Sequence, residues 1–393
     1  MKKLLLSPAD VIRRAITPLT AMLLIAGVSS CSDDPENPSE DSDLPSQTQP
    51  DFVSGQGVFL LNQGQFYNGI EGSLNFFDFS DLKVSNNIFA EINKRSLGDT
   101  PQCGVAYGGK IYIGVYNSNT IEILSASDYK SIKQILLDGT HGKEPRAIVP
   151  EGDKLYITMY DGYVARLDTT TLSIDKSVKV GPNPETPVIH KGKLFVPNSD
   201  GMNWANGYGT TASIVDLATF NVEATVDVPL NPDTFLSSGN RLFLLSKGNY
   251  GDVESALYEI DPEIASIQTT SDKKGWIKIA NATIVGADNE KVYLINAPFR
   301  EDGIVIDYSI YNTLSSVIEE WKPEGVDYPN AMAADPFTGN VVISSYIMDG
   351  PFPSYTAPGY GVLYGKDLKQ KAKFNIGTGP AAIFFTPRSS NID

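Results

Sequence analysis

Aromatic residues recur together with amide or carboxylate residues in short segments that separate the apolar stretches of the chain. Tyr116-Asn117, Tyr160-Asp161 and Asn203-Trp204 are three such pairs. Aromatic rings offer a large contact area at a small cost in side-chain entropy, and amides and carboxylates orient a ligand by hydrogen bonding. The combination predicts noncovalent binding of a sizeable ligand with flat apolar parts and many hydrogen-bonding groups. The alternative, for many of the individual aromatic residues, is packing inside the fold.

Polar residues that directly follow a recurring proline form a second group of candidate ligand contacts. Together with the aromatic segments they define one candidate binding face. Its members are Phe66, Tyr67, Gln102, Tyr116, Asn117, His141, Arg146, Tyr160, Asp161, Glu185, Asn203, Trp204, Tyr208, Asp233, Tyr250, Phe299, Arg300, Asn330, Tyr346, Met348, Phe352, Tyr355 and Tyr360.

Catalytic and metal-binding patterns are weak. One of the two histidines, His141, lies in a loop segment of the candidate face, where it either touches a ligand or a metal centre within one, or stays unengaged. The other, His190, is expected to be a solvated turn residue on the opposite face. The sequence has no zinc-site Cys/His spacing, no phosphate-binding glycine-rich loop and no Asp-rich calcium loop. It therefore favours binding over catalysis, and predicts no catalytic residue, no metal site and no resident cofactor.

A repeat of roughly 40–50 residues, the length of one four-stranded propeller blade, must position these residues. Each copy has a proline, an apolar strand and a Gly-x-(Lys/Arg)-hydrophobic-aromatic hairpin, as in Pro145 followed by Gly152-Asp153-Lys154-Leu155-Tyr156. In that copy we expect strands at 146–149, 154–159, 163–168 and 175–180. The repeat predicts an all-β propeller of seven blades. Six or eight blades are the alternatives, because the copy at 281–293 is degenerate.

The two ends of the repeat region are expected to complete one blade together. The first copy, with strands expected at 58–61, 73–79 and 84–92, lacks an innermost strand, and residues 381–385 are an innermost strand with nothing after it. Pairing them closes the ring without an open edge. A single propeller domain over residues 52–389 follows, and no stretch of the mature chain shows sustained helical periodicity.

Strand order assigns the loops to two faces. The turns between strands one and two and between strands three and four lie on one face. The inserts between strands two and three and the crossovers between blades lie on the other, which is the candidate binding face. The inserts at 198–208 and 347–360 are rich in glycine and proline and too long for core, and long loops on a rigid scaffold are commonly functional.

The first 51 residues read as an export and anchoring segment. Residues 1–30 have a basic start and a short apolar stretch, and Val28-Ser29-Ser30-Cys31 resembles the lipobox of bacterial lipoproteins, in which the cysteine is acylated. Residues 31–51 form an acidic tether, and its first residues, Ser32-Asp33-Asp34-Pro35-Glu36, resemble the surface-export signal of Bacteroidetes lipoproteins. These features predict a lipid-anchored outer-membrane protein that faces the medium. The alternatives are an ordinary signal peptide and an acidic linker with no sorting role.

Charge and cysteine usage restrict the partners. The formal net charge is −16, with 47 acidic and 31 basic residues, so nucleic acid is disfavoured and membrane contact is expected only through the acyl anchor. Cys103 lies in a predicted inner strand and is expected to be a buried thiol. With Cys31 acylated, no disulfide is expected.

The repeat resembles that of YncE-like seven-bladed propellers. With the lipobox and the acidic run, the whole chain resembles the propeller lipoproteins of gut Bacteroidetes, among them the BtuG-type proteins. The resemblance implies capture of a corrinoid (cobalamin) on one face and transfer to a TonB-dependent outer-membrane transporter. A glycan-binding or adhesion lipoprotein, and a propeller hydrolase or lyase, remain alternatives, because the fold alone does not choose among them.

Overall fold

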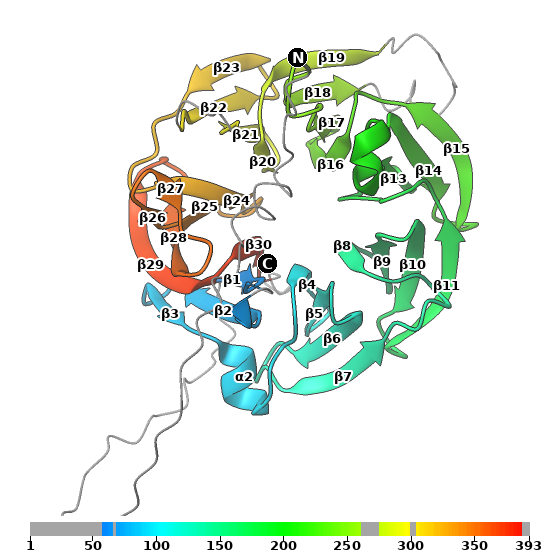
Figure 1. Ribbon diagram of the computed structural model, residues 1–393, viewed down its shortest axis with the longest axis horizontal. Coiled ribbons are helices and arrows are strands. Elements are labelled where there is room, and N and C mark those ends of the chain that lie inside the picture. Colours follow the sequence, from blue (N-terminus) through cyan, green and yellow to red (C-terminus); the bar gives the residue numbers. More distant parts are fainter. Residues whose placement is uncertain (1–56, 66–67, 261–274, 299–303, 387–393) are drawn as a thin grey trace, which may run out of the picture. The chain divides into compact units, whose positions relative to one another are not determined.

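Seven four-stranded antiparallel sheets form a β-propeller, with one strand of each sheet toward the centre of the ring (Figure 1). The computed structural model describes residues 57–65, 68–260, 275–298 and 304–386. The propeller lies in a compact unit that spans Phe52–Asp393. The expectations for residues 1–51, including acylation of Cys31, lie outside the described residues. Within the described ranges, no helix has the length and apolar character needed to cross a membrane.

The blades are numbered in chain order, and their strands are given from the centre outward. Blades one to four are β30 (Pro380–Phe385), β1 (Gly57–Asn62), β2 (Ser73–Asp78) and β3 (Lys83–Ser85); β4 (Pro101–Tyr107), β5 (Lys110–Val115), β6 (Thr120–Ser125) and β7 (Ser131–Leu136); β8 (Pro145–Glu151), β9 (Lys154–Met159), β10 (Tyr163–Asp168) and β11 (Ser173–Lys179); and β12 (Val188–His190), β13 (Lys193–Asn198), β14 (Thr211–Asp216) and β15 (Asn221–Asp227).

Blades five to seven complete the ring. They are β16 (Pro232–Ser238), β17 (Arg241–Ser246), β18 (Ala256–Ile260) and β19 (Trp276–Asn281); β20 (Ile284–Ala287), β21 (Lys291–Asn296), β22 (Asp307–Asn312) and β23 (Val317–Glu320); and β24 (Tyr328–Ala334), β25 (Val341–Tyr346), β28 (Pro358–Tyr364) and β29 (Gln370–Thr378). A small hairpin, β26 (Met348–Asp349) with β27 (Phe352–Pro353), lies in the insert of blade seven.

The ring closes through blade one, as the sequence predicts. Strand β30 pairs antiparallel with β1, and Phe59 lies opposite Phe384 in the register. Their rings stack at a centroid distance of 5.2 Å. Beyond the strands, the backbone N–H of Gln63 donates to the carbonyl of Gly379 at 2.7 Å. Residues more than 300 positions apart therefore form one sheet, which leaves no open inner edge in this blade.

The hydrophobic core lies between neighbouring blades. Successive side chains of a strand point to opposite faces of its sheet, so each blade packs on both neighbours. In β9, Leu155 and Ile157 pack against Tyr112 and Ile121 of blade two, whereas Tyr156 packs toward blade four. This alternation explains why the second strand of most blades is buried on both faces.

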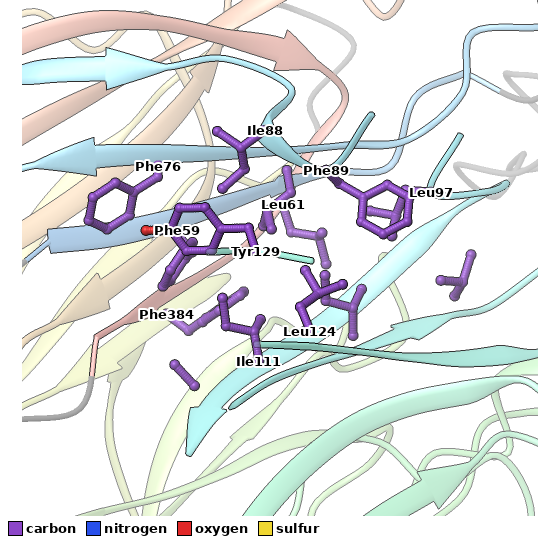
Figure 2. Close-up of a cluster of buried hydrophobic side chains, with 14 residues drawn as sticks. Phe59, Leu61, Phe76, Ile88, Phe89, Leu97, Ile111, Leu124, Tyr129 and Phe384 are labelled. Carbon is purple, nitrogen blue, oxygen red and sulfur yellow. The ribbon is translucent and has the colours of Figure 1, made fainter. Parts of the chain in front are cut away.

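The strand expected at 84–92 is wrong for most of its length. Strand β3 ends at Ser85, and helix α2 (Ile88–Asn93) follows. The helix buries Ile88 and Phe89 in the cluster between blades one and two, beside Phe59, Leu124 and other apolar side chains (Figure 2). Six residues are too few to show helical periodicity, so tertiary packing rather than sequence pattern fixes this helix.

The expectations for Cys103 and His190 have opposite outcomes. Cys103 is a buried free thiol, as predicted, and burial raises its pKa to about 12. The solvated turn position predicted for His190 is wrong. His190 ends strand β12 with 9% of its surface exposed, and its Nε2 atom is buried without a hydrogen-bond partner among the described residues. Burial, with a smaller contribution from Lys191, lowers the pKa of His190.

Candidate functional site

The crossover face comprises the entry points of the inner strands and the inserts between the second and third strands. In β4 and β5, Pro101 at the start of the inner strand pairs with Val115 at the end of its neighbour, and Pro145 pairs with Met159 in the same way. The residues that follow the recurring prolines and the insert residues therefore share one end of the blades.

Three of the candidate residues form a hydrogen-bonded chain across blades two, three and four. The Nε atom of Arg146 donates to Oε2 of Glu185 at 2.5 Å, and its Nη1 atom donates to Oε1 of Gln102. On the far side, the hydroxyl of Ser199 donates to Oε1 of Glu185 at 3.2 Å. These hydrogen bonds link the entry points of adjacent inner strands, which are far apart in the sequence.

The charges of Arg146 and Glu185 are compensated within the protein. Glu185 is buried, and burial raises its pKa while Arg146 opposes the change. Burial disfavours the charged form of Arg146, but Glu185 outweighs burial and raises the pKa of the guanidinium above its ordinary range. In blade five, the ammonium of Lys247 lies 3.8 Å from Oδ2 of Asp233. A ligand at this position therefore meets paired charges.

Four tyrosines from blades two to five, Tyr116, Tyr160, Tyr208 and Tyr250, form what we call the tyrosine arc. Tyr116 and Tyr160 make an edge contact at a centroid distance of 5.8 Å, and Tyr208 and Tyr250 make another at 5.9 Å. The guanidinium of Arg146 lies 5.4 Å from the ring centroid of Tyr160, so the arc adjoins the polar chain. The hydroxyl of Tyr116 donates to Glu144 at 3.2 Å, and burial and Glu144 raise the pKa of Tyr116 to about 12.

The insert of blade four continues the arc with a short 3₁₀ helix, η2 (Gly201–Asn206). The Nδ2 atom of Asn183 donates to the carbonyl of Tyr160 at 2.9 Å, and its Oδ1 atom accepts from the N–H of Met202 at 3.0 Å. A Cβ atom at Gly201 would lie 2.9 Å from the Tyr160 hydroxyl, so glycine permits the close approach. The helix leaves Trp204 47% exposed beside the arc.

Blade seven carries a separate aromatic group. Tyr346 contacts Tyr355 at 5.1 Å and Tyr328 at 6.3 Å between ring centroids. Phe352, in the β26–β27 hairpin with Met348, and Tyr355 are exposed, whereas Tyr346 and Tyr360 are buried. The hydroxyl of Tyr360 donates to Oδ2 of Asp327 at 2.6 Å. Tyr346 and Tyr360 therefore belong to the core, whereas Phe352 and Tyr355 form the exposed aromatic surface of blade seven.

The other candidates have local roles or lie elsewhere. Asn330 donates to the carbonyl of Pro380, and Asn117 donates to Thr100 at 3.0 Å. Asn203 donates at 3.0 Å to Asp200, which directly precedes η2, and Asp161 is exposed in the turn before β10. His141 lies in a groove with residues of the outer strands β7 and β11. Phe66, Tyr67, Phe299 and Arg300 lie outside the described residues.

Sequence reasoning did not identify Glu144, Asn183, Ser199 and Lys247, which contact Tyr116, Tyr160, Glu185 and Asp233, respectively. Asn183 and Glu144 immediately precede recurring prolines, and Ser199 and Lys247 immediately follow a second strand. The position of each residue within its repeat was therefore the signal that could have identified it. In the described ranges, no group of three or more His, Cys, Asp or Glu side chains is arranged to hold a metal ion. The arrangement suits stacking and hydrogen bonding with a ligand.

Comparisons with known proteins identify the fold. No protein-family model matches the sequence, and no curated protein matches it. Among solved structures, hydrazine synthase of Kuenenia stuttgartiensis superposes with a TM-score of 0.55 at 14% identity, over 72% of this chain and 88% of that one. The Pan2 WD40 domain of Neurospora crassa superposes with a TM-score of 0.50 at 8% identity, over 72% and 80% of the two chains. At these identities the likeness shows the β-propeller fold alone.

Proposed function

We propose that this chain is a lipid-anchored surface protein that binds a corrinoid on the crossover face and passes it to a TonB-dependent outer-membrane transporter. The observation that carries the proposal is the tyrosine arc next to the internally paired Arg146 and Glu185. A corrinoid is a broad, nearly neutral ring edged with amide groups. Tyrosine rings suit the apolar faces of this ring, and the paired charges of Arg146 and Glu185 suit a ligand without net charge.

The anchoring part of the proposal depends on the first 51 residues. The lipobox-like Val28-Ser29-Ser30-Cys31 and the acidic run after it support acylation at Cys31 and export to the outer surface. More than one acyl chain would be needed for stable attachment, because a single chain binds a membrane only marginally. Labelling with a radioactive fatty acid, in the wild type and in Cys31→Ala, tests this part separately.

Binding alone, without catalysis, is the role we propose for the crossover face. Arg146 is paired with Glu185, Lys247 lies near Asp233, and the aromatic side chains come from several blades, as expected of a surface that contacts a large ligand at many points. Gel filtration of residues 52–393 mixed with cyanocobalamin provides a direct test. Co-elution of the red ligand with the protein supports the proposal, and complete separation at micromolar concentrations contradicts it.

A glycan is the second candidate ligand. Trp204, which is 47% exposed beside the arc, is a suitable platform for stacking a sugar ring, and glycans can also be neutral. A glycan array probed with the same fragment separates the two candidates. Saturable glycan binding without cyanocobalamin binding would replace the corrinoid proposal with the glycan one.

A further inference from the structure

A groove of about 310 Å³ lies between the outermost strands of blades two and three. We call it the rim groove. Strand β7 and its continuation contribute Ile135, Leu136 and Leu137, and the start of β11 contributes Leu172 and Ile174. The volume is at the lower end of the range of roughly 300–1,000 Å³ that is typical of small-molecule sites. The groove shares no residue with the tyrosine arc.

Five of the eleven residues that line the rim groove are aliphatic. None of its described lining residues is a phenylalanine, tyrosine or tryptophan, in contrast to the crossover face. Leu136 is 74% exposed, although burial of a leucine side chain is favourable by about 2 kcal/mol. An exposed leucine in an aliphatic groove is a suitable contact for a flexible hydrocarbon chain.

A lysine and a histidine accompany the aliphatic side chains. Lys133 and His141 both line the groove, and Lys133 has no ion-pair partner among the described residues. The Nδ1 atom of His141 lies 3.2 Å from Oγ of Ser177, so one ring nitrogen is engaged in positioning the imidazole. Asp138 is the acidic residue of the lining, and its Oδ1 atom accepts the backbone N–H of Thr140 at 2.8 Å. In a chain of net charge −16, an unpaired lysine beside an apolar groove favours an anionic group there.

We propose that the rim groove binds an amphiphile with a single aliphatic chain and an anionic head group, such as a long-chain carboxylate. Lys133 and His141 receive the head group, and the five aliphatic side chains cover the hydrocarbon. This inference is independent of the corrinoid proposal, because it uses another surface and another ligand chemistry.

Titration of residues 52–393 with dodecanoate and with dodecyltrimethylammonium, below their micelle concentrations, tests the head-group preference. The carboxylate is expected to bind at least tenfold more tightly. Within the series from octanoate to dodecanoate, affinity is expected to rise by up to about fourfold per methylene, the equivalent of about 0.8 kcal/mol. Equal affinity for the two head groups, or no dependence on chain length, overturns the proposal.

Two exposed positions supply the variants. Lys133→Gln is expected to weaken dodecanoate about tenfold, and Leu136→Asp to abolish its binding. Lys130→Gln is the matched control, because Lys130 pairs with Asp128 at 3.1 Å and does not line the groove. Thermal melting verifies that each variant is folded. Wild-type affinity in folded Lys133→Gln and Leu136→Asp refutes the site, whereas cyanocobalamin binding should be unchanged in both.

Discussion

The Nε atom of Arg146 lies 2.5 Å from the Oε2 atom of Glu185, and this contact joins the entry points of the inner strands of blades three and four. The two residues are 39 positions apart in the chain. Gln102 extends the connection to blade two, and Ser199, directly after the second strand of blade four, supports it. The hydrogen-bonded residues Gln102, Arg146 and Glu185 of the crossover face therefore also connect the blades to one another.

Removal of one member of this pair should destabilise the propeller. Arg146→Ala leaves Glu185 buried without its counter-charge, and breaking a buried pair in this way costs about 3–5 kcal/mol. Because 31% of the Arg146 side chain is exposed, we expect about 3 kcal/mol in urea unfolding. Arg166→Ala is the control, since its partner Asp175 is 35% exposed, against 7% for Glu185, and this pair should contribute about 1 kcal/mol or less. Equal costs for the two variants would refute the role assigned to Arg146.

Closure of the ring should depend on Phe384. Its ring stacks on Phe59 in the core of blade one, so Phe384→Ala is expected to cost about 3–5 kcal/mol through lost contacts and the cavity left behind. Phe352→Ala, at a site that is 68% exposed, should change the free energy of unfolding by less than about 0.5 kcal/mol. Calorimetric melting of both variants measures the difference, and similar melting temperatures would contradict the closure argument.

The closure of the ring was predictable because both ends carry local patterns. The segment at 381–385 reads as an inner strand with no hairpin after it, and the first copy lacks such a strand. Helix α2 was not predictable, because its burial depends on Phe59 and Leu124, which are distant in the chain. Local pattern thus identifies the blades, whereas contacts between blades decide the exceptions.

The candidate site was predictable to the level of its face. The recurring prolines place Gln102, Arg146 and Glu185 at the same end of the blades, but no pattern indicates that they bond to one another. Aromatic residues pose a similar problem. Tyr360 and Trp204 occur in comparable inserts, yet one is 3% exposed and the other 47%. The position of Tyr360 depends on Asp327, which accepts a hydrogen bond from its hydroxyl. The position of the insert that carries Trp204 depends on Asn183, which accepts the N–H of Met202.

The stability of the propeller should fall as the pH is lowered through the range of histidine titration. The pKa of His190 is lowered in the folded state, so the unfolded chain takes up this proton first, near its ordinary pKa of about 6.5. The contribution of neutral His190 is therefore complete above about pH 6.5 and declines below it. His190→Asn should flatten this dependence between pH 5 and 7 in urea unfolding. An unchanged slope in His190→Asn would contradict the buried neutral state.

The exposed insert of blade four should serve the ligand rather than the fold. Trp204→Ala is expected to weaken ligand binding while the melting temperature stays within about 2 °C of the wild type, because η2 contributes no buried residue. In blade seven, only the hairpin at 348–353 is suitable for the same test, since removal of residues up to Tyr360 would also remove a core side chain. Unfolding of Trp204→Ala would show that the insert is structural.

Calorimetric titration of residues 52–393 with cyanocobalamin tests the central claim most directly. The proposal predicts saturable one-to-one binding that weakens about thirtyfold in Tyr250→Ala, the equivalent of about 2 kcal/mol for a hot-spot aromatic contact. Phe337→Ala is the control, because Phe337 is an exposed aromatic residue in the β24–β25 turn at the opposite end of the blades. Its affinity should equal that of the wild type. Absence of binding heat in the wild type, or equal affinity in all three proteins, would contradict the assignment of the crossover face.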